Sequence, residues 1–276
     1  MMVNKILTLF DMEFKRVQKI FFTIISLLIL GNILAFSLGI YWTINYQGAQ
    51  TKVKQGLGVL TNNMGKETLL NSAIPDIIYP ISNILMILAL IWCAFYCVLI
   101  WYRDFSSKSK SIYTLFMLPE NKFIIFISKL LTMVVLIYMI IFTQHLCWAI
   151  EGFLINKYTN IPMINMIESI NNIGKVGLFR IAVRIYPMEI LMIYIIGPIV
   201  GVTALFAAVL MSKSIKKVGG IMGILYILGL GACYIGITGV YEYSDIILKN
   251  NIIFFTVVFI ISICTSYNLL KNKMYD

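Results

Sequence analysis

Residues 79–102 read YPISNILMILALIWCAFYCVLIWY, and no charged side chain occurs between Asp76 and Arg103. A helix of about 20 apolar residues crosses the hydrocarbon core of a bilayer, so this run is long enough to span a membrane. Five further apolar runs of comparable length lie near 20–42, 123–150, 185–212, 218–241 and 251–270. The sequence therefore predicts an all-α polytopic membrane protein with six transmembrane helices.

The composition supports the membrane class over a water-soluble one. Of the 276 residues, 60% are hydrophobic and only 12% are charged, whereas a soluble domain carries about 25% charged residues. Six spans leave only two long external segments, near 43–78 and 151–184, and no room for a catalytic domain. We therefore expect one transmembrane domain over residues 1–276 and no enzymatic activity in this chain.

The charge of the chain bears on its partners and its orientation. The formal net charge is +10, but the basic residues are scattered among loops, which favours orientation and contact with membrane lipids over nucleic-acid binding. With the N-terminus inside, short cytoplasmic segments hold thirteen lysines and arginines, and the longer external loops hold eight. The positive-inside rule then predicts that both termini are cytoplasmic.

The first nineteen residues have the pattern of an amphipathic helix. Apolar side chains recur every three or four residues, and polar or charged ones fill the other side: the apolar set is Ile6, Phe10, Phe14, Val17 and Phe21. Residues 1–19 are thus predicted to form an interfacial helix at the cytoplasmic surface. Its role is either that of an anchor or that of a surface that also touches a cytoplasmic partner.

The loop between the second and third spans, residues 103–122, is the only sizeable cytoplasmic loop. Its apolar side chains fall on one side of a short predicted helix that Pro119 ends: Ile112, Tyr113, Phe116 and Met117. Either this helix packs against its own bundle or it docks on a cytosolic protein. We favour docking because Arg103, Lys108 and Lys110 flank the apolar patch.

Few side chains in the spans are polar. His145 is the only histidine, and we expect it either to make an interhelical hydrogen bond or to line a transport path. Glu189 lies just inside the fourth span, where it can pair with Arg184 or serve transport. Gly219 and Gly223 have the small-xxx-small spacing, repeated by Ala232 and Gly236, which predicts either tight packing within one subunit or a dimer or gating surface.

The five cysteines and the absence of catalytic motifs limit the reactions that this chain could catalyse. All five cysteines fall within predicted spans, which favours small packing side chains over disulfides. One histidine excludes a metalloprotease HExxH site, and the sequence has no G-x-x-x-x-G-K-[ST] phosphate loop. The chain cannot hydrolyse ATP itself, so uphill transport would need an ion gradient or a separate ATPase.

Residues 102–131, YRDFSSKSKSIYTLFMLPENKFIIFISKLL, carry a resemblance to a known family. An amphipathic N-terminal helix, a first span and a charged amphipathic loop that runs into the third span are similar to the type-2 permeases of ABC transporters, especially the small six-span subunits of Gram-positive bacteria. Arg103 and Asp104, the pair Leu118 and Pro119, and Lys129 stand at the recurring positions. A lysine about a turn inside the membrane, as Lys129 would be, can snorkel to the cytoplasmic face.

The resemblance implies a function and partners. The loop would be a coupling helix that binds a cytoplasmic ATP-binding subunit through Arg103, Asp104, Ile112, Tyr113, Phe116, Met117 and Pro119. That subunit would hold ATP and Mg²⁺, leaving no cofactor in this chain, and a second permease subunit, identical or divergent, would complete the path. The expectation is an exporter of a peptide or amphipathic compound, such as an antimicrobial peptide, in the bacterial plasma membrane. The alternatives are an ion-coupled secondary carrier or channel without an ATPase partner and a membrane assembly or sensor protein without cargo.

Overall fold

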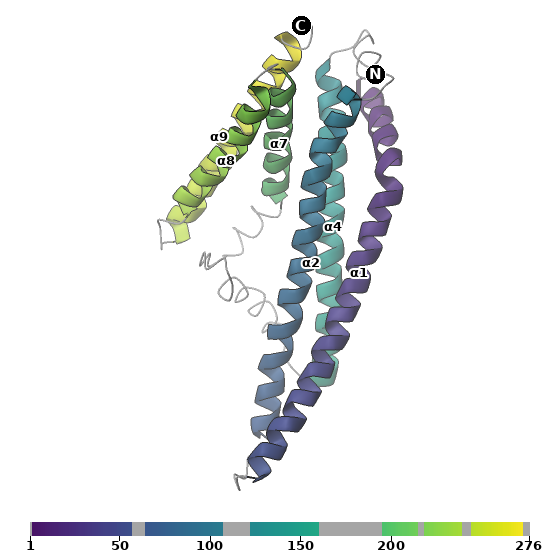
Figure 1. Ribbon diagram of the computed structural model, residues 1–276, viewed down its shortest axis with the longest axis vertical. Coiled ribbons are helices and arrows are strands. Elements are labelled where there is room, and N and C mark those ends of the chain that lie inside the picture. Colours follow the sequence, from purple (N-terminus) through teal and green to yellow (C-terminus); the bar gives the residue numbers. More distant parts are fainter. Residues whose placement is uncertain are drawn as a thin grey trace. The chain divides into compact units, whose positions relative to one another are not determined.

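The computed structural model describes residues 2–56, 64–106, 122–159, 195–214, 218–238 and 244–272 (Figure 1). These ranges are helical apart from single turns, and they contain no strand. The helices are α1 (Met2–Gly56), α2 (Met64–Ser106), α4 (Lys122–Thr159), α7 (Gly197–Ser214), α8 (Gly219–Thr238) and α9 (Ser244–Asn272).

Six segments within the described helices are long and apolar enough to cross a membrane, one in each helix. They are Lys5–Tyr41, Ile81–Phe105, Phe123–Leu154, Gly197–Ser214, Gly219–Ile237 and Lys249–Lys271. The prediction of an all-α, multi-pass membrane protein is confirmed at this level. The fourth segment begins later than the predicted start at 185, since residues 185–194 lie outside the described part of the chain.

Helix α1 contains two segments that were predicted to be separate helices. The predicted interfacial helix over 1–19 and the predicted first span over 20–42 form one helix that continues to Gly56. No proline or glycine occurs between Phe10 and Phe21, so nothing in the local sequence interrupts the backbone hydrogen bonds there. A separate interfacial helix is therefore not confirmed.

The chain divides into two compact units, and α1, α2 and α4 each contribute to both. The first unit comprises Met1–Phe21, Leu90–Met139 and Ile185–Asp276, and the second comprises Phe22–Ala89 and Ile140–Arg184.

In the first unit, α7, α8 and α9 pack side by side (Figure 1). Val200 and Ala204 of α7 and Val258 of α9 are buried together, and Tyr226 of α8 and Ser262 of α9 share a hydrogen bond of 2.8 Å. A Cβ atom added at Gly219 would lie 2.6 Å from the carbonyl oxygen of Ser212. One added at Gly223 would lie equally close to that of Ala208. This pair of glycines therefore serves tight packing within the subunit.

Aromatic side chains connect α7 to α2 and α4 within the same unit. Trp101 of α2 meets Phe206 of α7 edge to face at a centroid distance of 5.6 Å, and Phe126 of α4 contacts both rings. The ammonium of Lys213 at the end of α7 lies 4.1 Å from the ring centroid of Tyr102. All three helix ends are thereby held together by aromatic contacts.

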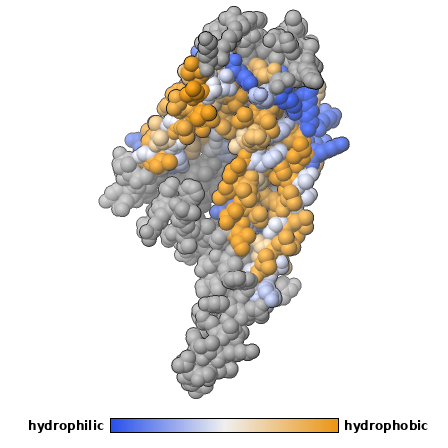
Figure 2. All heavy atoms as spheres, viewed as in Figure 1, coloured by the Kyte–Doolittle hydropathy of each residue, from blue (hydrophilic) through white to orange (hydrophobic). Residues whose placement is uncertain are grey.

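The outer faces of α8 and α9 are apolar. Leu225 and Leu228 of α8 and Ile260 of α9 are among the many large hydrophobic side chains that stay exposed. Figure 2 shows such side chains extending along the helices. Apolar surface of this extent is typical of a protein surrounded by lipid.

The second unit contains a polar contact among three helices. The side-chain amides of Asn32 in α1 and Gln144 in α4 exchange two hydrogen bonds of 3.1 Å, and the hydroxyl of Ser82 in α2 donates to the Asn32 Oδ1 atom at 2.6 Å. All three side chains are buried. Polar side chains in an apolar bundle act as interhelical contacts when they satisfy one another in this way.

Candidate functional site

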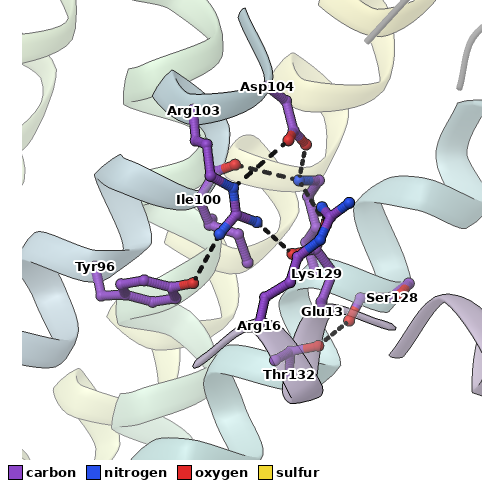
Figure 3. A network of polar contacts seen from close by, with 9 residues as sticks. All are labelled: Glu13, Arg16, Tyr96, Ile100, Arg103, Asp104, Ser128, Lys129 and Thr132. Carbon is purple, nitrogen blue, oxygen red and sulfur yellow. Dashed lines mark hydrogen bonds and ion pairs between the residues drawn. The ribbon is translucent and has the colours of Figure 1, made fainter. Parts of the chain in front are cut away.

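Five charged side chains from three helices meet in the first unit (Figure 3). They are Glu13 and Arg16 of α1, Arg103 and Asp104 at the end of α2, and Lys129 of α4, and we call them the charge cluster. The cluster contains two carboxylates and three cationic groups. It draws on residues separated by more than one hundred positions in the sequence.

Lys129 is the most deeply buried cation of the cluster. The residue is 1% exposed, and its ammonium donates to Asp104 Oδ2, to the carbonyl oxygen of Ile100 at 3.2 Å and to Glu13 Oε1 at 3.4 Å. An ammonium has three N–H donors, and here each finds an acceptor. Lys129 therefore does not snorkel to the surface. Counter-charges inside the bundle allow it to stay buried.

Glu13 is the hub of the cluster. Its Oε2 atom accepts a hydrogen bond of 2.7 Å from Arg103, and its Oε1 atom lies 3.4 Å from both Arg16 and Lys129. The residue is only 5% exposed. A carboxylate that contacts several cations can be buried with a smaller penalty than an unpaired one.

Glu13 is not among the residues predicted for the site, although the sequence contains a signal for it. Glu13 stands four residues before Val17 and eight before Phe21, and both of these apolar side chains are fully buried. Residues spaced by four lie on one face of a helix. An acid on the apolar face of α1 therefore indicates a cationic partner on a neighbouring helix.

Arg103 connects the cluster to the body of α2. Its Nη1 atom donates to the hydroxyl of Tyr96 at 3.3 Å, and its Nε atom lies 3.9 Å from Asp104 Oδ1. Together with the bond to Glu13, three sides of the guanidinium face polar groups. The planar fork of an arginine suits such multiple contacts better than a lysine ammonium would.

The position of the cluster along the chain gives it mechanical importance. Asp104 lies two residues before α2 ends at Ser106, and Lys129 lies two turns after α4 begins at Lys122. Their ion pair joins the two helices that flank residues 107–121, and Glu13 adds α1 to the same junction. The Lys129 ammonium also lies 5.1 Å from the Trp101 ring centroid. Displacement of the end of α2 or of the start of α4 would thus act on three helices together.

The structure describes only some of the predicted site residues. Arg103 and Asp104 lie in the charge cluster, and their role in binding a partner stays a prediction. The other predicted coupling-helix residues, Ile112, Tyr113, Phe116, Met117 and Pro119, lie outside the described residues, as does Glu189.

His145 belongs to the second unit and is exposed. Its Nδ1 atom lies 2.8 Å from the carbonyl oxygen of Ile141, one turn earlier in α4. The neighbouring Gln144 makes the interhelical hydrogen bonds to Asn32 described above. Whether His145 lines a path stays a prediction.

The described side chains offer little for metal or redox chemistry. No group of three or more His, Cys, Asp or Glu residues is placed to hold a metal ion within the described ranges. All five cysteines are free, and Cys93 and Cys97 are fully buried. The interpretation as packing residues holds for these two, whereas Cys233 and Cys264 are exposed.

Comparison with protein-family models, with curated proteins and with solved structures gives no match for the chain. The resemblance to the type-2 permeases of ABC transporters therefore rests on the residues quoted above and stays a prediction.

Proposed function

We propose that the chain is the transmembrane permease subunit of an ATP-driven ABC exporter in the bacterial plasma membrane, with both termini in the cytoplasm. The observation that carries this proposal is the ion pair of Asp104 with Lys129, anchored to α1 through Glu13. A permease that receives work through its second cytoplasmic segment needs both ends of that segment fixed to the helices that move. The charge cluster meets this need.

The proposed work comes from a separate ATP-binding subunit that holds ATP and Mg²⁺. Residues 107–121 would dock on it through Ile112, Tyr113, Phe116, Met117 and Pro119. ATP binding would displace this segment, and the charge cluster would pass the displacement to α1, α2 and α4 as one body. Buried ion pairs suit this role because removing one partner typically costs about 3–5 kcal/mol, so they resist separation.

A second permease subunit, identical or divergent, would face this one around the path. Alternating exposure of that path to the two sides would then export the cargo, without bond chemistry in this chain. A peptide or amphipathic compound, such as an antimicrobial peptide, is the proposed cargo. Low charge in the spans, together with the aromatic residues Tyr41, Trp42, Tyr79 and Trp148 near their outer ends, supports such a cargo.

One observation favours an ion-coupled carrier as a second candidate. Glu151 is 5% exposed within the membrane-spanning segment Phe123–Leu154, and its Oε2 atom has no hydrogen-bond partner among the described residues. Carboxylates at such positions are costly and often serve ion movement. Transport by a carrier of this kind would collapse with the ion gradient and survive removal of any ATPase.

Affinity purification of the tagged chain in mild detergent tests the proposal, with mass spectrometry of whatever co-purifies. We expect a stoichiometric P-loop ATPase that is lost in Phe116→Asp. Ser111→Asp is the matched control, since it adds the same charge to the same loop without removing an apolar side chain. Purification of the chain without an ATPase in several detergents would reject the exporter and favour the carrier.

A further inference from the structure

We propose that Arg16 binds the phosphate of an acidic phospholipid in the leaflet at the N-terminal end of α1. This inference depends on the membrane location of the chain and not on the proposed export function. Among the described residues, Arg16 is the cation of the charge cluster that has contacts on a single side.

Arg16 has unused hydrogen-bonding capacity. Its only polar contact with the described residues joins Nη1 to Glu13 Oε1 at 3.4 Å, and its side chain is 44% exposed. A guanidinium carries five N–H donors in a planar fork that matches two oxygens of a phosphate. Arg103, by contrast, already faces Tyr96, Glu13 and Asp104.

The local charge is unbalanced in the direction that attracts an anion. Within the charge cluster, three cations, Arg16, Arg103 and Lys129, face two carboxylates, Glu13 and Asp104, which leaves a formal charge of +1. Figure 2 shows hydrophilic side chains gathered at this end of α1. Excess positive charge next to a membrane surface attracts acidic lipids.

The level of Arg16 along α1 identifies the anion as a lipid headgroup. Between Lys19 and Lys52 the sequence has no charged residue, so Lys15, Arg16 and Lys19 are the last charges before the apolar part of the helix. Ile20, one turn after Arg16, is 53% exposed and apolar. A ligand bound here would place an anionic group next to the Arg16 guanidinium and an apolar chain next to Ile20. A phospholipid has both groups.

Native mass spectrometry of the purified full-length chain tests the proposal with phosphatidylglycerol and phosphatidylcholine of identical acyl chains. We expect the wild type to retain phosphatidylglycerol preferentially and Arg16→Gln to reduce its apparent affinity about fivefold, the effect of one basic residue at a membrane surface. Arg16→Lys should recover only part of the preference, because an ammonium lacks the fork.

Lys15→Gln is the matched control. Lys15 is the neighbouring residue, carries the same charge and is 68% exposed, but it is paired with Asp11 at 2.6 Å. We expect it to lower the lipid preference less than Arg16→Gln does, because the Lys15 ammonium already contacts Asp11. Equal retention of both lipids by the wild type, or equal losses in Arg16→Gln and Lys15→Gln, would overturn the proposal. Displacement of phosphatidylglycerol by inorganic phosphate would likewise show a phosphate site that does not select a lipid.

Discussion

Lys129 and Asp104 form an ion pair in which each side chain is only 2% exposed. The pair joins α2 to α4 on the two sides of residues 107–121, and neither residue reaches bulk water. Its consequences for stability and for movement of the helices can be tested separately.

The first prediction concerns the energy of this pair. Lys129→Met leaves Asp104 buried without its closest cation, so we expect the free energy of unfolding to fall by about 3–5 kcal/mol. Asp104→Asn should cost less, because Glu13 still compensates Lys129. The double variant should be more stable than the sum of the single losses predicts, by about 1–3 kcal/mol. Unfolding in mild detergent measures all three, and additive losses would show that the two residues do not interact.

The second prediction compares two acids of α1. Glu13→Gln leaves Arg16, Arg103 and Lys129 without their shared counter-charge, and we expect it to lower the unfolding free energy by about 3 kcal/mol or more. Asp11→Asn removes only an exposed contact to Lys15, worth about 1 kcal/mol at most. Thermal unfolding of both variants in the same detergent gives the comparison. Similar melting temperatures for the two would contradict the role of Glu13 as the hub.

High salt should further distinguish the stability contribution of Glu13 from that of Asp11. The pair of Lys15 with Asp11 is exposed and should be screened, whereas the contacts of Glu13 are buried and should be screened much less. The stability difference between Glu13→Gln and the wild type should therefore persist at high ionic strength. Its disappearance would place the cluster in contact with solvent.

Much of the fold could be predicted from the sequence because apolar length alone identifies a spanning helix. The six runs correspond to six described helices, and the pair Gly219 and Gly223 indicated close packing. The cluster could not be predicted in full, since Glu13 and Lys129 meet only through tertiary packing over a separation of 116 positions. The contacts of Gln144 and His145 could not be predicted from the sequence for the same reason. Both are polar and adjacent, and only the three-dimensional arrangement shows that Gln144 pairs with Asn32.

The third prediction uses two glycines of α8 with different surroundings. Gly223→Ala would place a Cβ atom 2.6 Å from the backbone oxygen of Ala208, so α7 and α8 must separate, at a cost of about 1–3 kcal/mol. Gly229→Ala meets nothing within 4 Å, and alanine favours a helix by about 1 kcal/mol over glycine. Unfolding measurements should show opposite signs. A stabilising Gly223→Ala would mean that the two helices are less closely packed.

The last prediction separates structural from transport roles at Glu151. A buried carboxylate with an unsatisfied oxygen destabilises the folded chain, so Glu151→Leu should raise the unfolding free energy by about 1–3 kcal/mol. If the chain is an ATP-driven exporter, this variant should also retain transport, because the energy enters through the charge cluster. Glu13→Gln should then show the reverse pattern, with lower stability and less transport per ATP hydrolysed. Loss of transport in Glu151→Leu together with a rise in stability would instead identify Glu151 as a functional carboxylate and favour the ion-coupled carrier.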